Sequence, residues 1–294
     1  MAGAAAILTP KEAKAISFQT TQYTTISTGG WSWFLSNSVT AVAKGLGIGY
    51  ATSTSTDDPL IGAFVMTVNG TGFQAPGGIL DISGNTVTTN TTVMSGLTTS
   101  AQFYFRGSTV RVIYTYTNNT ANSITATIQW QNNIYGGGSA PIVAVSNGGT
   151  TETPASSWVI AWDNEDSPVT MARYGPAGTL KPAAINTPGN SSALLVDQYS
   201  LTVPAGQTRM LMFFGQLSTS TSQAIANSGT FNNTGNLASA GLLTGLTVQQ
   251  ESEIVNWFAS PNSVPAAGSI SLLMTVALVA ALGVKYLKWP LPSR

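Results

Sequence analysis

The densest group of acidic side chains lies in one short polar stretch, where Asp163, Glu165 and Asp166 surround Asn164. Oxygen atoms at alternate positions of a loop are the ligands that Ca²⁺ takes in proteins. The stretch lacks the central glycine and the distal bidentate glutamate of a developed calcium loop. It therefore predicts either a weak Ca²⁺ site, the single cofactor that the sequence suggests, or a solvated loop whose acids face water.

Two residue types that carry much of enzyme chemistry are missing, because the chain has no cysteine and no histidine. Their absence excludes disulfides, thiolate nucleophiles, serine–histidine triads and most transition-metal sites. No lysine follows a serine at the spacing of the S-x-x-K nucleophile motif. We therefore expect a protein without catalysis of its own. A glycan-active hydrolase stays an alternative because that reaction needs only two facing carboxylates, although no pair among the acids can be singled out.

Aromatic side chains offer a different chemistry, because exposed tryptophan and tyrosine rings can stack on sugars. Tryptophans at alternating strand positions are more often core residues, so both interpretations stay open. The sequence therefore leaves a carbohydrate-binding module, with extracellular polysaccharide as its partner, as an alternative function. The candidate tryptophans are Trp31, Trp33, Trp130, Trp158 and Trp162.

Charge is scarce, since 7% of the residues are charged against roughly 25% in typical soluble domains. A surface made of threonine, serine, asparagine and glycine is typical of exported all-β proteins. Without the three basic residues of the last ten positions, 8 basic and 11 acidic residues remain. This body has no basic stripe, so nucleic acid is excluded as a partner.

The elements that must position these residues read as β-strands. Apolar and polar residues alternate with period two over residues 102–105, 110–116 and 124–130, which predicts neighbouring antiparallel strands. Residues 158–162, 199–203 and 209–215 are further strand candidates. The run 45–49 misses the spacing of a dinucleotide-binding motif and is expected to be a flexible turn. Short helices are expected after residue 218, the best over 247–258, where Thr247 and Gln250 have the spacing of a capping box.

The C-terminal segment 269–287 is almost purely apolar and long enough, at about 20 residues, to cross a bilayer. Lys285, Lys288 and Arg294 lie at or beyond its end, and basic residues are retained on the cytoplasmic side. The pattern predicts a transmembrane helix with a cytoplasmic C-terminus. The alternative is an apolar helix buried in a soluble core.

The same tail resembles the sorting signals of bacterial PEP-CTERM and IPTL-CTERM surface proteins. Val264 and Pro265 match the start of their short motif, an apolar helix follows, and the basic cluster closes it. The Glu-Pro of the motif is replaced by Ala266 and Ala267, and the usual arginine-rich end is reduced. A further likeness covers 202–257, from the "VPAGQTR" stretch to "VNW". The resemblance implies a surface protein that an exosortase-type membrane protease processes near the motif.

Taken together, these patterns predict an all-β protein: a large antiparallel β-sandwich with a few short C-terminal helices and one C-terminal transmembrane helix. The expected segments are an N-terminal stretch of unclear role (1–15), the extracellular sandwich body (16–258), with a division into two sub-domains near 136–150 left open, a spacer (259–268), the transmembrane helix (269–287) and a basic cytoplasmic tail (288–294). The expected function is a structural or adhesive role at the cell surface or in the extracellular matrix. Carbohydrate binding is the first alternative. The ligand, the assembly state, the export route and cleavage of the tail are left undetermined.

Overall fold

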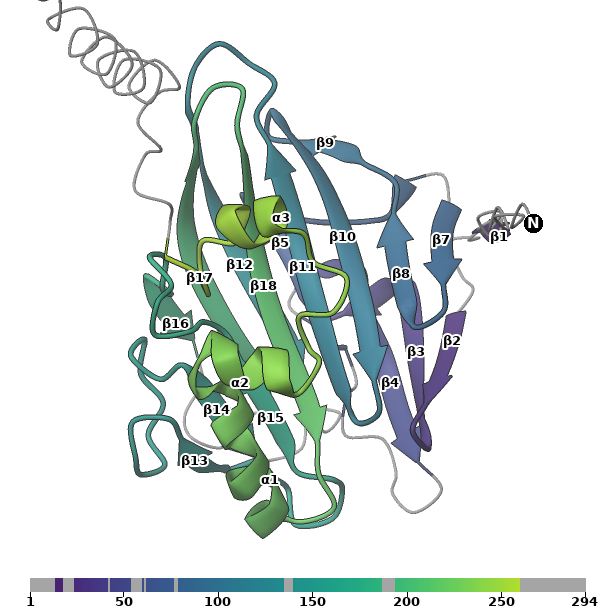
Figure 1. The fold of residues 1–294 in the computed structure, drawn as a ribbon, viewed down its shortest axis with the longest axis vertical. Helices are drawn as coiled ribbons and strands as arrows, with labels where there is room; N and C mark the ends of the chain where they lie inside the picture. Colours follow the sequence, from purple (N-terminus) through teal and green to yellow (C-terminus); the bar gives the residue numbers. More distant parts are fainter. Residues whose placement is uncertain are drawn as a thin grey trace, which may run out of the picture.

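The structure is a computed structural model that describes residues 14–17, 24–41, 43–53, 60, 62–76, 79–134, 140–186 and 194–259. Most of this chain forms antiparallel β-strands arranged in three sheets (Figure 1). The largest sheet has ten strands in the order β1-β7-β8-β10-β11-β18-β15-β14-β13, with β9 paired to β10. Its strands are β1 (Lys14–Ser17), β7 (Ile79–Ser83), β8 (Thr86–Thr89), β9 (Thr92–Met94), β10 (Leu97–Arg106), β11 (Thr109–Thr117), β13 (Ile142–Val145), β14 (Trp158–Ala161), β15 (Val169–Ala172) and β18 (Thr208–Leu217).

Two smaller sheets form the opposing layer. The five-stranded sheet has the order β16-β17-β12-β5-β6, and the three-stranded sheet has the order β2-β3-β4. An isolated bridge between Ile48 and Ala63 links them. Their strands are β2 (Thr24–Thr28), β3 (Trp31–Thr40), β4 (Lys44–Ser53), β5 (Val65–Val68), β6 (Thr71–Gly72), β12 (Ile124–Asn133), β16 (Ala184–Asn186) and β17 (Leu194–Val203).

The main core lies between the two layers and is built by the predicted period-two alternation. In β10 every second residue is buried, and Phe103 and Phe105 point into the core. The neighbouring strand β11 contributes Val110 and Val112 in register with them. Trp130 of β12 stacks on Phe213 of β18, with ring centroids 4.4 Å apart, so the two layers are joined by an aromatic contact. The predicted β-sandwich is confirmed, because alternation places one face of each strand against the other layer.

A second, smaller core lies on the other face of the ten-stranded sheet. Three short helices and a 3₁₀ turn cover part of that face: α1 (Thr221–Ser228), η3 (Gly229–Asn232), α2 (Thr234–Ser239) and α3 (Val248–Glu253). They bury side chains of β11, β14, β15 and β18, including Met212 and Phe214. Thr247 and Gln250 form the predicted capping box.

The last predicted helix is shorter than its sequence pattern indicated. We expected helix over 247–258, but α3 ends at Glu253. Ile254 instead pairs with Met210 of β18, and Trp257 is fully buried. Val248, the first residue of α3, is 83% exposed. Burial of Ile254, Val255 and Trp257 against β18 ends the helix, because this apolar contact requires the chain to leave the helical path.

The predicted transmembrane part of the fold is corrected. Within the stretches that the structure describes, no helix is long and apolar enough to cross a membrane. The segment 269–287, on which the prediction rested, lies outside the described residues. The fold is therefore assigned as a β-sandwich with short helices. A membrane-anchored location with a cytoplasmic C-terminus is not retained.

Candidate functional site

The predicted Ca²⁺ loop is built as a turn. Asp163 Oδ1 accepts hydrogen bonds from the backbone N–H groups of Glu165 (3.0 Å) and Asp166 (2.9 Å). Asn164 adopts a positive φ of 73°, and Glu165 is exposed. A carboxylate oxygen that caps its own turn is engaged with backbone rather than aimed at an ion. Over the described part of the chain, no group of three His, Cys, Asp or Glu side chains is arranged to hold a metal.

The tryptophans named as candidates for sugar stacking are mostly core residues. Trp33 and Trp130 are completely buried, and Trp31 and Trp158 are 9% and 8% exposed. Trp162 is half-buried, and its indole N–H donates to the carbonyl of Asp166 over 2.8 Å. Of the five candidates, Trp162 is therefore the one that is not buried.

The tail residues Val264, Pro265, Lys285, Lys288 and Arg294 lie outside the described residues. The resemblance to an exosortase-processed sorting signal accordingly stays a prediction.

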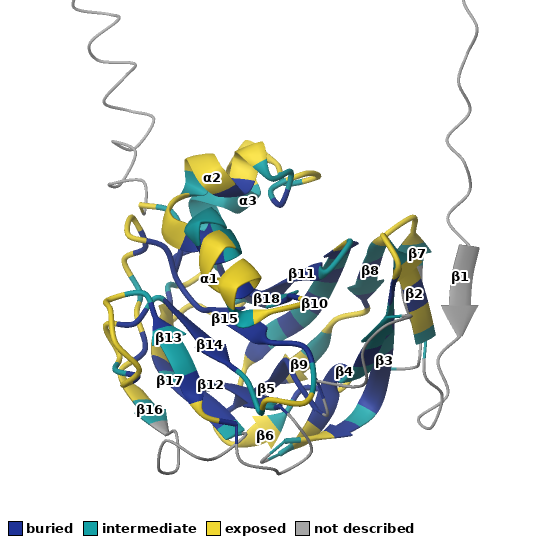
Figure 2. Cartoon of the chain, turned by 90° about the horizontal axis from the view of Figure 1, so that it is seen from below, coloured by how far each residue is buried: buried dark blue, intermediate teal, exposed yellow. Residues whose placement is uncertain are grey.

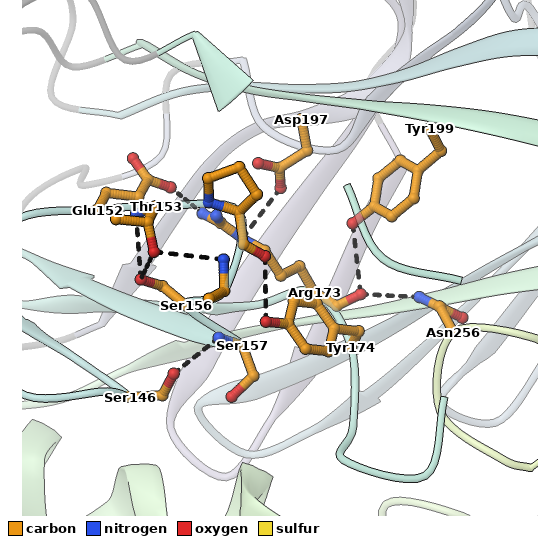
Figure 3. A network of polar contacts seen from close by, with 12 residues as sticks. Ser146, Glu152, Thr153, Ser156, Ser157, Arg173, Tyr174, Asp197, Tyr199 and Asn256 are labelled. Atoms are coloured by element: carbon orange, nitrogen blue, oxygen red, sulfur yellow. Dashed lines mark hydrogen bonds and ion pairs between the residues drawn. The ribbon is translucent and has the colours of Figure 1, made fainter. Parts of the chain in front are cut away.

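A charged cluster that the sequence did not reveal is buried between the layers (Figure 3). The guanidinium of Arg173, which directly follows β15, pairs with the carboxylates of Glu152 and Asp197. Asp197 lies in β17, and its Oδ2 is 3.1 Å from Arg173 Nε. The side chains are exposed by only 0% for Arg173, 2% for Glu152 and 1% for Asp197. These residues lie far apart in the sequence, so no spacing motif could have indicated the cluster.

The electrostatics of this cluster follow from one cation facing two anions away from water. The two carboxylates raise the pKa of Arg173, and their effect outweighs the opposing effect of burial. Burial raises the pKa of Asp197 to about 7, although Arg173 acts in the opposite direction. The contact between Arg173 Nε and Asp197 Oδ2 is not aligned as a hydrogen bond. Burial away from water disfavours the charged form of Asp197, and the misaligned contact with Arg173 offsets this cost only partly. The carboxyl group of Asp197 therefore keeps its proton up to about neutral pH.

Hydrogen bonds from the surroundings fix the backbone of Arg173. Its carbonyl accepts bonds from Asn256 Nδ2 (2.8 Å) and from the Tyr199 hydroxyl (3.4 Å). Tyr174, the next residue, donates to the carbonyl of Pro154 over 3.1 Å. Glu152 and Asp197 are two acids brought together, as the hydrolase alternative requires, but the guanidinium lies between them and both are buried. A substrate cannot reach these two carboxylates. Their observed partner is the buried guanidinium of Arg173.

A further surface to consider for ligand binding is the part of the ten-stranded sheet that the helices leave uncovered (Figure 2). We call this surface the open face and define it by six residues of the paired strands β8 and β10. Their side chains lie on the side of the sheet that points away from the main core. Five are half-buried and Arg106 is exposed. The six residues are Thr86, Thr88, Ser100, Gln102, Tyr104 and Arg106.

The open face is polar because it faces neither core. The opposite side of β10 carries Ala101, Phe103 and Phe105, all within the sandwich. Half-buried hydroxyl and amide groups on a concave sheet keep both donors and acceptors available. The ribbon in Figure 2 shows this sheet curved, with the helices over one part and the strands β8 and β10 left uncovered.

Arg111 forms the border between the open face and the helices. Its guanidinium donates to the carbonyls of Leu242 (2.7 Å) and Thr244 (3.1 Å) and to Gln102 Oε1 (3.2 Å). It also lies over the ring of Tyr104, 4.8 Å from the centroid. Burial lowers the pKa of Arg111 to about 10, so the side chain remains charged at neutral pH. These contacts fix Gln102 and Tyr104 in place and join the open face to the loop after α2.

A second arginine packs against the same loop. The guanidinium of Arg106 lies so close to Gly241 that a Cβ atom there would be 2.7 Å from Arg106 Cζ. Gly241 also has a positive φ of 68°, a conformation that favours glycine. Glycine at position 241 is therefore favoured by its backbone conformation, whereas the end of the flexible Arg106 side chain could shift to admit a Cβ atom.

Comparison with known proteins gives no family for this chain, because no protein-family model and no curated protein matches it. Solved structures that resemble it include a putative aldose 1-epimerase from Escherichia coli K12, with 10% identity, coverage of 67% of this chain and 99% of that one, and a TM-score of 0.41. A galactose mutarotase-like protein from Lactobacillus casei gives 9% identity, coverage of 67% and 100%, and a TM-score of 0.40. A heparinase III gives 8% identity, coverage of 74% and 38%, and a TM-score of 0.43.

These comparisons correct one expectation. From the sequence we expected a non-catalytic structural or adhesive protein, whereas the similar structures are named as an epimerase, a mutarotase-like protein and a heparinase. We therefore no longer place the chain in the non-catalytic class or describe it as adhesive. Their names concern carbohydrates, which was also the first alternative that we drew from the sequence. With TM-scores below 0.5, function has to be argued from this chain's own residues.

Proposed function

We propose that the protein binds glycans through the open face of its ten-stranded sheet. The observation that carries the proposal is the position of Tyr104, a half-buried ring held from one side by the guanidinium of Arg111 among side chains that offer hydrogen bonds. A fixed aromatic ring provides an apolar surface for the C–H groups of a sugar. The neighbouring Thr86, Ser100 and Gln102 provide donors and acceptors for its hydroxyls.

The side chains of the open face are held in place before any ligand binds, which distinguishes this surface from an ordinary polar surface. Gln102 accepts a hydrogen bond from Arg111, and Arg111 is itself anchored on two backbone carbonyls. Side chains already held in one conformation lose little entropy when a ligand binds. The open face therefore offers a rigid centre at Gln102 and Tyr104, with hydroxyl groups around it.

The test is binding of neutral oligosaccharides to the whole protein, measured by calorimetry across a panel of hexose polymers. Tyr104→Ala should weaken binding about tenfold, or 1.4 kcal/mol, because the stacking surface is lost. Tyr104→Phe should retain most of the affinity because it keeps the ring. Tyr50→Ala is the matched control, since Tyr50 is another half-buried strand tyrosine, in β4 of the opposing layer.

The proposal fails if no neutral glycan of the panel binds, or if Tyr104→Ala and Tyr50→Ala have the same effect. Thermal unfolding of each variant shows whether the fold is retained, so that a loss of binding can be assigned to the surface. Thr88→Val provides a second probe of the open face, because it removes a hydroxyl from the row of Gln102 without touching the ring.

A further inference from the structure

Two arginines lie close together at one end of the open face. The register of the β10–β11 hairpin places Arg106 diagonally across from Arg111, on the same side of the sheet. Such diagonal neighbours are about 7–8 Å apart, which long side chains can bridge. Both guanidiniums also reach the loop after α2, where Arg106 packs against Gly241 and Arg111 donates to the carbonyl of Leu242 over 2.7 Å. Two positive charges are therefore gathered where the open face meets this loop.

Neither arginine is neutralised by an acid of the described chain. Both ion pairs that the described residues form belong to Arg173, in the core. The six residues of the open face include Arg106 and no acid. Among the described residues, Arg111 is compensated by hydrogen bonds alone, and its buried Nε has no partner there. A buried charge is costly without an opposite charge, so an anion bound nearby would stabilise this end of the sheet.

The two arginines offer a ligand different things. Arg111 is 1% exposed and its guanidinium donates three hydrogen bonds, so it stays below the surface as a fixed positive charge. A fixed charge in a water-poor environment attracts an anion without touching it. Arg106 is exposed, and its planar fork of N–H donors can contact a ligand directly. The buried arginine therefore supplies potential and the exposed one supplies contact.

The ring of Tyr104 lies between these two charges. Tyr104 pairs with Arg111 across the hairpin and comes two residues before Arg106 on β10. Side chains two residues apart on a strand share a face and are separated by about 7 Å. A sugar ring stacked on Tyr104 is therefore placed so that an acidic substituent at its edge reaches the guanidinium of Arg106.

We propose that the glycan bound by the open face is anionic, with a carboxylate paired to Arg106 and the ring that bears it on Tyr104. This inference rests on the proposed glycan binding and names the class of glycan. A planar guanidinium matches a carboxylate through two parallel hydrogen bonds, which a lysine cannot reproduce. The positive charge of Arg111 beside Tyr104 favours an acidic sugar over a neutral sugar of the same shape.

Calorimetry of the whole protein with a trimer of galacturonate, and with its methyl ester as the uncharged probe, tests this preference. At low ionic strength the acid should bind about fivefold more tightly than the ester, the size expected of one exposed ion pair. Arg106→Gln should lower the affinity for the acid to that for the ester. Arg106→Lys keeps the charge but loses the paired geometry, so its affinity for the acid should be intermediate. High salt should remove the preference of the unmodified protein.

The matched control removes an arginine elsewhere in the same sheet. Arg209 is half-buried and lies at the opposite end of β18 from Gln216, the residue in the row of Arg106 and Thr109. Arg209→Gln should keep the preference for the acid. Equal affinity for acid and ester, a preference that survives Arg106→Gln, or one that Arg209→Gln removes would each overturn the anionic site. Thermal unfolding of each variant identifies any that fails to fold.

Tyr104→Ala separates this inference from the proposed function. If acid and ester bind alike and Tyr104→Ala weakens both, glycan binding stands and the charge preference is overturned. If the acid is preferred and its binding needs Arg106 but not Tyr104, the stacking role of Tyr104 is contradicted and the site at Arg106 is supported. If the acid does not bind, the inference is overturned, and the panel of neutral glycans decides the proposed function by itself.

Discussion

Replacing Asp197 by asparagine should change how the stability of this protein depends on pH. The side chain is buried beside Arg173 and Glu152, and its pKa is raised to about 7 in the folded state, mainly by burial. In the unfolded chain an aspartate has a pKa of about 3.9. Between these values the folded protein holds a proton that the unfolded chain has released. The stabilising contribution of Asp197 is therefore complete below pH 4 and declines as the pH rises towards 7.

The size of the effect follows from the same two pKa values. One pKa unit corresponds to about 1.4 kcal/mol, so a shift of about 3 units corresponds to about 4 kcal/mol across the interval. Asparagine cannot ionise, and Asp197→Asn should lack this decline. Arg173 contributes no slope here, because the carboxylates raise its pKa and it stays protonated throughout.

Urea unfolding of the wild-type protein and Asp197→Asn at half-unit steps from pH 4 to pH 8 measures the difference directly. We expect the stability of wild type relative to the variant to fall by about 4 kcal/mol and then to level off above pH 7. Glu165→Gln, at an exposed acid outside the cluster, is the control for the loss of one carboxylate. Parallel curves for Asp197→Asn, or a difference that rises with pH, would refute the assignment of a buried proton to this site.

Three further substitutions test the packing of the C-terminal segment. Gly178→Ala should destabilise the protein by about 3 kcal/mol or more, because its Cβ would lie 2.1 Å from the carbonyl oxygen of Asn256. The control is Gly229→Ala, whose Cβ would have no contact shorter than 3.9 Å and which should leave thermal unfolding unchanged. Asn256→Ala should cost about 3 kcal/mol in urea unfolding, because its buried amide bonds Arg173 O (2.8 Å), Met212 O (2.7 Å) and Met212 N (2.9 Å); a loss below 1 kcal/mol would contradict that role. Thr247→Ala removes the capping box of α3 and should cost about 1 kcal/mol, with Thr247→Ser close to wild type by the same measurement.

Alternation alone was sufficient to predict the strands of the main core. In β10 and β11 the side-chain period of two follows from the backbone, and a face rich in Phe, Val and Tyr must be buried whatever the partner layer is. The capping box of α3 was also predictable, because Thr247 and Gln250 bond within one turn of chain. Local geometry fixes such features, so sequence spacing is enough to find them.

The glycine-rich run 45–49 shows where local reasoning failed. We expected a flexible turn, and the structure has the strand β4 there. A Cβ at Gly47 would be 2.5 Å from the carbonyl of Ala63, and one at Gly45 would be 2.9 Å from that of Phe73. The glycines permit close approach of a second backbone, and they do not make the chain flexible. That requirement comes from a neighbour distant in the sequence, which no local pattern reveals.

The candidate sites depended on tertiary structure still more strongly. Composition determined that neither histidine nor cysteine takes part in the function. The sequence also identified the acidic loop 163–166, but not the backbone hydrogen bonds by which Asp163 caps its turn. Two contacts arise only when separate strands meet: the pairing of Arg173 with Asp197 and the contact of Arg111 with Tyr104. The sequence by itself determined which face of each strand is apolar, because side chains alternate along a strand. The tertiary structure decided which charges lie together and which remain open, because burial and distance set their interactions.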